Sequence, residues 1–143
     1  MPFSAAEIAY LATQPLARLA TVDDEGQPDV VPVTFELDGD ALWVGGSGAS
    51  FLATRKVRNL RSHPQVALVV DDVPSFDPFV ARSVRVYGVA EPPVERVGRV
   101  GPGHYVRIVP TVSWSWNLEG EPAGDTWYPA RRTIHAAPPP GGR

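Results

Sequence analysis

Cysteine is absent from this sequence of 143 residues, and lysine occurs only once, as Lys56. The lack of cysteine excludes disulfides, thiolate metal sites and cysteine nucleophiles. No apolar run approaches the roughly 18 residues of a membrane-spanning helix, and the first ten residues lack the basic segment of a secretory signal. We therefore expect a cytoplasmic protein with no membrane partner.

Charge of neither sign dominates, since 13 Lys and Arg stand against 16 Asp and Glu, with a net charge of -3. This balance gives no general attraction to nucleic acid, so we expect no nucleic-acid partner. The length and the hydrophobic share of 43% suit one folded domain. We expect that domain over residues 1–119 and a Pro/Gly-rich tail over 120–143, whose last seven residues, APPPGGR, are unstructured.

Short apolar segments between turn residues predict strands rather than long helices. Six strands are expected at residues 16–22, 29–37, 41–46, 65–72, 83–91 and 104–118. Only two helices are expected, one opened by a capping box of Ser4 and Glu7 and one over residues 50–62. Six antiparallel strands joined by hairpins predict a mainly β fold, a small closed barrel with two short helices.

Single positions within these elements give finer predictions. Ile8, Leu11 and Ala12 share one face of the first helix, which we expect to be buried. Pro32 has no N–H and should therefore lie at a strand edge or a bulge. In residues 104–118 the apolar side chains keep one face unless Pro110 shifts the alternation.

The second helix carries four basic residues and no acidic one. At about 100° per residue, Lys56 falls inside the apolar stripe centred on Ala53. Arg55 lies on the flank of that stripe, and Arg58 and Arg61 point toward solvent. The four cations are therefore not equivalent.

Two interpretations of Lys56 are equally compatible with its position on the helix. Lysine is rarely buried without a partner, so Lys56 either reaches solvent along its alkyl stem or binds an anion. A phosphate held by Arg55, Lys56 and backbone N–H groups would offset the unfavourable placement of cations in the first turns of a helix. The preceding GGSGAS allows close approach of the backbone to a ligand, but it matches neither the dinucleotide nor the P-loop motif.

No cluster of side chains predicts a metal site or a catalytic acid or base. His63, His104 and His135 stand singly and are best interpreted as surface or capping residues. The pair Asp71-Asp72 is better explained as a strand end that enters a turn than as a metal site. We therefore expect no metal and no catalytic side chain.

Several segments, in order, resemble a known family. RLATVDDEGQPDVVPV, then TRKVRNLRSHPQVALVVDD, then VRVYGVAE and a Ser-Trp pair are similar to the pyridoxamine 5'-phosphate oxidase-like split-barrel family. The likeness is greater to the branch that uses the deazaflavin coenzyme F420, in the subgroup that includes a tetracycline-pathway reductase. It spans roughly residues 6–118.

The resemblance implies a six-stranded split barrel that forms a homodimer, with two cofactor sites between the subunits. It assigns the cofactor phosphate to Thr54, Arg55 and Lys56, with Asn59 as the next candidate. It places the cofactor ring along the backbone of Gly45, Gly46 and Ser47 and the strand at Val31, Pro32 and Val33. Trp116 is expected at the cofactor site or the dimer seam.

The function implied is an F420-dependent oxidoreductase that transfers a hydride between the deazaflavin and a small planar organic substrate. Two alternatives stay open: an FMN-dependent oxidoreductase of the same fold, and a non-catalytic protein that binds a flavin, haem or bilin. FMN and F420 carry the same proximal phosphate, so Arg55 and Lys56 do not distinguish them. F420 adds an acidic oligoglutamate tail, which we expect Arg58 or Arg61 to meet.

Overall fold

Antiparallel strands form most of the computed structural model, which describes residues 1–47 and 49–135. The first half holds α1 (Ala5–Thr13), β1 (Leu16–Val22), β2 (Pro28–Asp38), β3 (Ala41–Ser47), the 3-10 helix η1 (Ala49–Ala53) and α2 (Arg55–Ser62). The second half holds β4 (Gln65–Phe76), β5 (Phe79–Ala90), β6 (Val94–Gly98), β7 (Gly101–Trp116) and β8 (Arg131–Ile134). None of the helices in these ranges is long and apolar enough to cross a membrane.

Six of the strands close into a barrel. Neighbouring strands follow the order β3-β2-β1-β4-β5-β7, and β7 pairs back with β3. The predicted six-stranded antiparallel barrel with two short helices is therefore confirmed. Two further strands, β6 and β8, pair with β7 and were not expected. β6 occupies the Pro/Gly-rich stretch before His104, and β8 comes from the tail; the predicted disorder of APPPGGR lies outside the described residues.

The barrel interior is filled by alternating apolar side chains from each strand. The largest fully buried ones include Leu19, Phe35, Leu42, Leu68 and Ile108. At about 25 cal/mol per Å² of apolar surface, each such side chain contributes roughly 1.5–3 kcal/mol. As Pro32 has only β1 beside it, the prediction of an edge position is also confirmed.

Helix α1 covers the interior with a different face from the one predicted. Its capping box of Ser4 and Glu7 is present, and its buried residues are Glu7, Tyr10 and Leu11. Ile8 is 44% exposed and Ala12 is exposed, so the predicted face was wrong for both. The buried carboxylate of Glu7 is hydrogen-bonded on both oxygens, which makes its burial possible.

A bulge in β7 changes which side chains face inward. Tyr87 pairs with Val112 and Gly88 with Pro110, which leaves Thr111 as an extra residue. Val106 and Ile108 face the core before the bulge, whereas Ser113 and Ser115 are the buried residues after it. The apolar side chains therefore do not keep one face along β7: the shift at Pro110, which was the alternative, occurs and puts Trp114 and Trp116 on the outer face of the sheet.

The second helix starts later than predicted. Residues 49–53 form η1, and α2 begins only at Arg55, so Ala53 is exposed rather than central to the buried stripe. Val57 and Leu60 are the buried apolar residues of α2.

Asp71 and Asp72 do not end their strand, since β4 continues to Phe76. Asp72 instead accepts two hydrogen bonds from Arg82 and one from the Tyr10 hydroxyl, at 2.7 Å for the latter. The hydrogen bonds from Arg82 lower the pKa of Asp72 despite its partial burial. The interpretation as a strand end was wrong: Asp72 fixes α1 on the sheet through Tyr10, whereas Asp71 pairs with Arg18 of β1.

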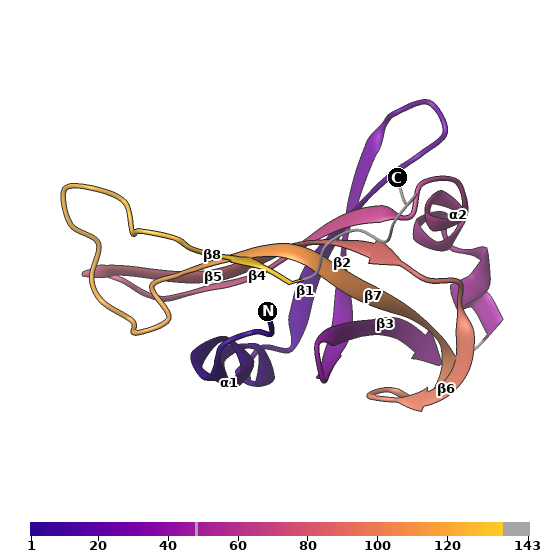
Figure 1. Cartoon of the computed structure of the whole chain (residues 1–143), viewed down its shortest axis with the longest axis horizontal. Helices are drawn as coiled ribbons and strands as arrows, with labels where there is room; N and C mark the ends of the chain where they lie inside the picture. The colour runs from indigo at the N-terminus through magenta and orange to yellow at the C-terminus, as the bar shows by residue number, and fades with distance from the viewer. Residues whose placement is uncertain (48, 136–143) are drawn as a thin grey trace.

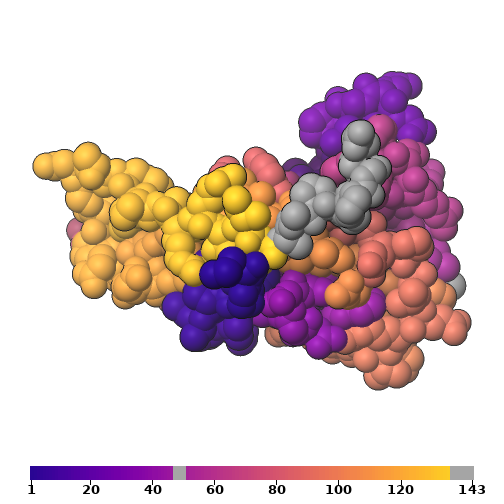
Figure 2. Space-filling model, in the orientation of Figure 1, coloured from indigo at the N-terminus to yellow at the C-terminus, as the bar shows by residue number. Residues whose placement is uncertain are grey.

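The molecule is elongated, with different elements at its two ends (Figure 1). Helix α2 lies at one end, which we call the α2 end. The hairpin between β4 and β5 and the first part of the tail lie at the other, which we call the tail end. Figure 2 shows residues 120–130 as a projection from the tail end.

Candidate functional site

The hairpin of β2 and β3 opens at the α2 end. The pairing of the two strands runs from Asp38 and Ala41, beside the turn, to Phe35 and Val44 and stops there, although both strands continue. Beyond that pair β2 has only β1 as a neighbour, and β3 has only β7. The predicted ring-lining residues from the two strands, Val31–Val33 and Gly45–Ser47, lie on these two unpaired edges. The structure thus brings the two predicted segments to one opening.

The two glycines of β3 have different physical roles. A Cβ on Gly45 would stand 2.5 Å from the His104 carbonyl oxygen and 2.5 Å from the Tyr105 ring, so only glycine fits there. A Cβ on Gly46 would meet only Phe51, at 4.0 Å. Glycine at 45 is therefore explained by packing inside the chain, whereas at Gly46 the packing leaves room for a ligand.

The β2 segment offers its backbone rather than its side chains. Val33 is buried in the core and Val31 packs against it, while Pro32 is exposed. The unpaired edge of this segment carries main-chain groups that can hydrogen-bond a flat heteroaromatic ring. For Ser47, the backbone pairs with Gly103.

The start of α2 follows directly from this opening. Thr54 is the N-cap, but its hydroxyl donates to the Phe51 carbonyl oxygen at 2.7 Å and caps no N–H of the helix. The first N–H groups of the helix thus have no side-chain cap, and Arg55 and Lys56 are its first two residues. Uncapped N–H groups and two cations favour an anion.

Lys56 is half-buried, with Nζ 5.4 Å from the centre of the Phe51 ring. Burial lowers the pKa of Lys56, and the charge of Asp29 opposes that effect. Within residues 1–47 and 49–135, neither Lys56 nor the helix's three arginines forms an ion pair with a carboxylate. Asp29 and Asp23 act on Lys56 and Arg55 only through longer-range charge. No ion pair has to be broken for a phosphate to bind there, so the residues present fit a cofactor that carries a phosphate.

Asn59 lies on the inner side of α2. It is only 6% exposed, and its Nδ2 donates to Thr21 Oγ1 of β1 at 3.0 Å. This hydrogen bond holds α2 against the barrel. Whether Asn59 also contacts a cofactor stays a prediction.

Trp116 does not lie with the other predicted site residues. It stacks on Tyr128 with ring centres 5.6 Å apart and meets the edge of Trp127 at 5.2 Å. Phe79 lies 6.3 Å from Trp127, and Phe76 lies 5.8 Å from Phe79. We call these five rings the aromatic tip; it lies at the tail end, whereas Thr54, Arg55 and Lys56 lie at the α2 end (Figure 1).

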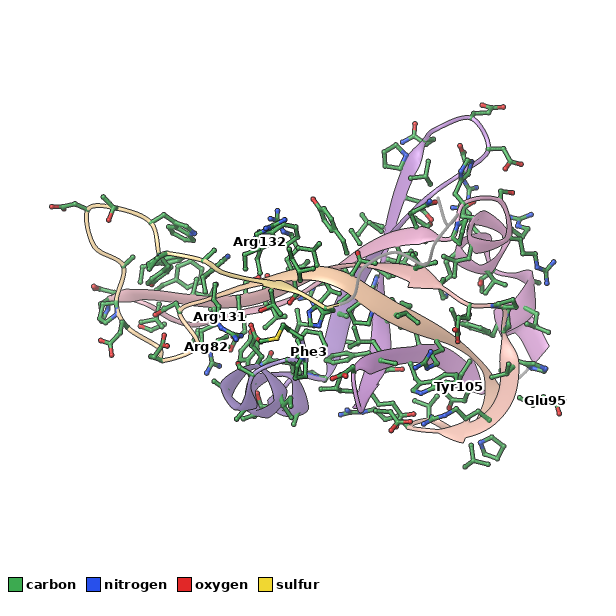
Figure 3. All side chains as sticks on the ribbon, viewed as in Figure 1. Phe3, Arg82, Glu95, Tyr105, Arg131 and Arg132 are labelled. Carbon is green, nitrogen blue, oxygen red and sulfur yellow. The ribbon has the colours of Figure 1, made fainter. Side chains whose placement is uncertain are left out.

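A buried carboxylate ties the tail to the barrel. Glu7 is fully buried and accepts hydrogen bonds from Ser4 N at 2.8 Å, Ser115 Oγ at 2.5 Å and Arg131 Nη1 at 3.0 Å. Burial alone would raise the pKa of Glu7, but these hydrogen bonds and the Arg131 charge outweigh it and hold the pKa below its ordinary value. Figure 3 shows Arg131 on the α1 side of β8 and Arg132 on the other.

The sequence identified Glu7 only as a capping-box residue, because its other partners lie 108 and 124 positions away. The histidines are not brought together: His63 caps α2, His104 lies near Glu95, and His135 contacts Ser113. Within the described ranges, no group of three metal-ligating side chains occurs.

Two clefts lie away from the predicted phosphate residues. One, of about 380 Å³, lies between the start of α1 and the tail, with Ser4, Trp116, Tyr128 and Arg131 in its wall. The other, of about 360 Å³, lies between α2 and the segment after β5, with Leu60, Arg61 and Pro92 in its wall.

Comparison with known proteins gives a consistent picture. The chain is 40% identical, over 125 residues, to a 5a,11a-dehydrotetracycline/5a,11a-dehydrooxytetracycline reductase from Streptomyces rimosus subsp. rimosus. The alignment covers 85% of this chain and 87% of that protein.

Solved structures share the fold. A conserved hypothetical protein from Mycobacterium tuberculosis is similar with a TM-score of 0.65 and 25% identity, over 87% of this chain and 92% of that one. A protein described as an F420 reductase has a TM-score of 0.57 and 24% identity, over 73% and 93%. HutZ, a heme storage protein from Vibrio cholerae, has a TM-score of 0.57 and 19% identity, over 77% and 91%.

The family model described as pyridoxamine 5'-phosphate oxidase matches residues 4–99, from the cap of α1 through the barrel strands to the end of β6. This span includes both edges of the opening and the start of α2. The chain therefore belongs to the pyridoxamine 5'-phosphate oxidase family.

Proposed function

We propose that this protein is an oxidoreductase that uses coenzyme F420 to transfer a hydride to or from a flat, conjugated small molecule. The observation that carries the proposal is the start of α2. Arg55 and Lys56, which form no ion pair with a carboxylate of the described residues, adjoin uncapped N–H groups and an opening with unpaired strand edges. The relative from Streptomyces rimosus is a reductase, which supports the same class of chemistry.

The chain's own residues supply position and charge, and the deazaflavin supplies the hydride chemistry when it is bound. Arg55 and Lys56 would hold the phosphate, with Thr54 at the helix start. The backbone edges at Val31–Val33 and Gly45–Ser47 would orient the ring. Because Val33 and Phe35 are packed in the core, the inner side of the opening is apolar.

The substrate class follows from the relative and from the opening. The relative reduces dehydrotetracyclines, according to its description. An opening edged by strand backbone and by the apolar Val31 and Val33 suits a planar enone, quinone or polyketide better than a sugar. No catalytic side chain is assigned: the hydride transfer needs alignment of the two flat rings, and the proton that completes the reduction of an enone can be supplied by solvent water.

The functional unit we propose is a homodimer. Trp116, expected at the cofactor site or the dimer seam, lies at the far end of the same copy, so a second copy would be needed to bring it to a cofactor site. The outer face of the sheet between the two ends carries Tyr87 at 44% exposure and Val89 at 40%, with Trp114 beside them. Exposed aromatic and aliphatic side chains on a sheet face suit contact with a second copy.

The test is a comparative titration of the purified protein with F420 and with FMN, followed by absorbance. We expect saturable binding of F420 with higher affinity than FMN. Mixing the reduced complex with a polycyclic enone should then oxidise the deazaflavin in a single turnover.

Each other result has a definite meaning. If FMN binds more tightly than F420, the protein is an FMN-dependent oxidoreductase instead. Saturable binding of F420 without oxidation by any flat acceptor would favour a storage protein. Failure to bind either cofactor would overturn the proposal.

A further inference from the structure

The hairpin of β1 and β2 carries carboxylates beside the start of α2. Asn59 of α2 donates to Thr21 of β1 at 3.0 Å, which holds the helix against this hairpin. Figure 1 shows the turn of the hairpin on the side of the molecule on which α2 lies. Asp23 and Asp29 stand on either side of that turn. The cations of α2 thus have acidic neighbours in the fold, although they have none in their own segment.

The strand register turns Asp29 toward the helix. In the ladder of β1 and β2, Asp29 lies directly opposite Thr21, and directly opposed residues of an antiparallel pair have their side chains on the same face. That face is the one that α2 covers, because the Thr21 hydroxyl accepts the hydrogen bond from Asn59. Lys56 lies three residues before Asn59, which places both on one side of the helix. Asp29 and Lys56 therefore point toward the same junction of hairpin and helix.

Asp29 also continues a row of side chains along the opening. Val33, Val31 and Asp29 alternate along β2 with more exposed residues and so share one face of the strand. Val33 is buried, Val31 packs against the core and Asp29 is half-buried. The row thus changes from apolar to acidic where it reaches the predicted phosphate residues of α2.

The two carboxylates differ in what holds them. Asp23 accepts hydrogen bonds from the backbone N–H groups of Glu25 and Gln27 at 2.8 and 2.9 Å, which fix it in the turn. Asp29 forms no ion pair with any residue that the structure describes. Its charge opposes the effect of burial on the pKa of Lys56. Asp29 is therefore the carboxylate whose charge is directed at the phosphate site.

We infer that Asp29 adjusts the charge of the phosphate site, so that the site favours a phosphodiester with one negative charge over a phosphomonoester with two. Arg55 and Lys56 supply the positive charge. Asp29 offsets part of it at Lys56, as Asp23 does at Arg55. The positive charge that remains matches a single negative charge, whereas a second one would face Asp29 without a counter-charge.

The two candidate cofactors differ in this charge, so the inference deepens the proposed function and rests on it. The phosphate of FMN is a monoester, which carries close to two negative charges above about pH 7. In F420 the same phosphate is also esterified to the part of the molecule that bears the oligoglutamate tail, and it keeps one negative charge. Asp29 therefore favours F420 over FMN at the phosphate itself, apart from any contact of the tail with Arg58 or Arg61.

The first test needs no cofactor. Lys56 is the only lysine of the chain, so protein labelled with isotope-enriched lysine gives one ε-methylene signal in NMR spectra, and its shift follows the titration of this amine. Asp29→Asn should lower the pKa of Lys56, because it removes the charge that opposes burial. Asp40→Asn removes the same charge at the exposed turn beyond the other end of β2 and should leave the pKa unchanged. An unchanged pKa in an Asp29→Asn protein that is folded by circular dichroism would overturn the inference.

The second test measures selectivity between the cofactors. It is a titration at about pH 8, where the monoester is ionised twice. Asp29→Asn should tighten binding of FMN about tenfold and of F420 about threefold, because the interaction energy of Asp29 with a phosphate doubles when the charge of the phosphate doubles. Asp40→Asn should change neither affinity. Equal gains for both cofactors, or no gain for FMN, would contradict a role of Asp29 in the choice of phosphate.

The inference and the proposed function fail in different measurements. A lowered pKa of Lys56 together with no binding of F420 would remove the cofactor from the proposal and leave Asp29 beside Lys56. Tight binding of F420 together with an unchanged pKa of Lys56 would keep the cofactor and remove Asp29 from the site.

Discussion

The two ends of this molecule differ in what holds them and in how far local sequence accounts for them. The α2 end is built from consecutive segments, β2, β3, η1 and α2, and its cations stand within one short stretch. The tail end is built from parts far apart in the chain, with Glu7, Ser115 and Arg131 in one hydrogen-bonded group. A site made of neighbours in sequence can be found by motif, whereas one made of distant residues becomes visible only in the fold.

The largest expected effect concerns the group that fixes the tail end. Glu7→Ala should lower the free energy of unfolding by about 3 kcal/mol, since it removes the capping box, worth about 1 kcal/mol, and the acceptor of a buried hydroxyl, worth about 1–3 kcal/mol. Urea unfolding measures this. Ile8→Ala, on the exposed side of the same helix, should change it by less than about 0.5 kcal/mol. Equal losses would show that α1 buries the face predicted from the sequence.

The two adjacent glycines allow a comparison within the α2 end. Gly45→Ala should cost about 1–3 kcal/mol of stability, because its Cβ would stand 2.5 Å from a backbone carbonyl oxygen. Gly46→Ala should leave stability nearly unchanged and instead weaken cofactor binding. Thermal unfolding and cofactor titration of both variants separate the two roles. A stable Gly45→Ala protein would contradict the close approach of β3 and β7.

Removal of the half-buried cation tests the phosphate assignment. Lys56→Ala should weaken binding of both F420 and FMN about tenfold to hundredfold, as expected for loss of a hydrogen bond to a charged group. Arg132→Ala, an exposed arginine on β8, is the matched control and should bind as the wild type does. Unchanged affinity of Lys56→Ala for both cofactors would leave Lys56 as a solvated residue of the helix.

Acid should loosen the tail end before it affects the α2 end. The pKa of Glu7 lies below its ordinary value of 4.5 in the folded protein. Its ionised form therefore contributes stability that is fully present above that value and is lost as the pH falls through the lowered pKa. The stability difference between wild type and Glu7→Gln should shrink between pH 6 and pH 3 on the scale of ~1 kcal/mol. A difference that does not depend on pH would contradict an ionised Glu7.

The smallest effect separates the two cofactors. Arg58→Glu with Arg61→Glu should weaken F420 binding a few-fold more than FMN binding, because only F420 carries an oligoglutamate tail and exposed pairs are worth about 0.2–1 kcal/mol each. Titration of a dimeric preparation keeps this effect apart from dimer dissociation. Equal loss for both cofactors would remove the two arginines from cofactor recognition.

The barrel could be predicted from the sequence because most of its strands show their own pattern. Residues 16–22 and 29–37 are found as β1 and β2 with bounds that differ by at most one residue. β6 and β8 were missed because VERVG and RRTI are short and polar, and only their pairing with β7 makes them strands. The burial of Glu7 and the partners of Asp72 could not be predicted, since each depends on a side chain more than 60 positions away or on the opposite strand of a hairpin.

Lys56 is the one ε-amino group in the chain, and its pKa is lowered by burial. At mildly alkaline pH a larger share of it is the neutral nucleophile than for an exposed lysine. An acylating reagent at low dose then modifies one side chain, which the mass of a single proteolytic fragment distinguishes from the α-amino group. Since we place the cofactor phosphate on this amine, a bound cofactor should protect it from the reagent. The fraction of Lys56 that stays unmodified then measures the fraction of occupied sites, without an absorbance or activity assay.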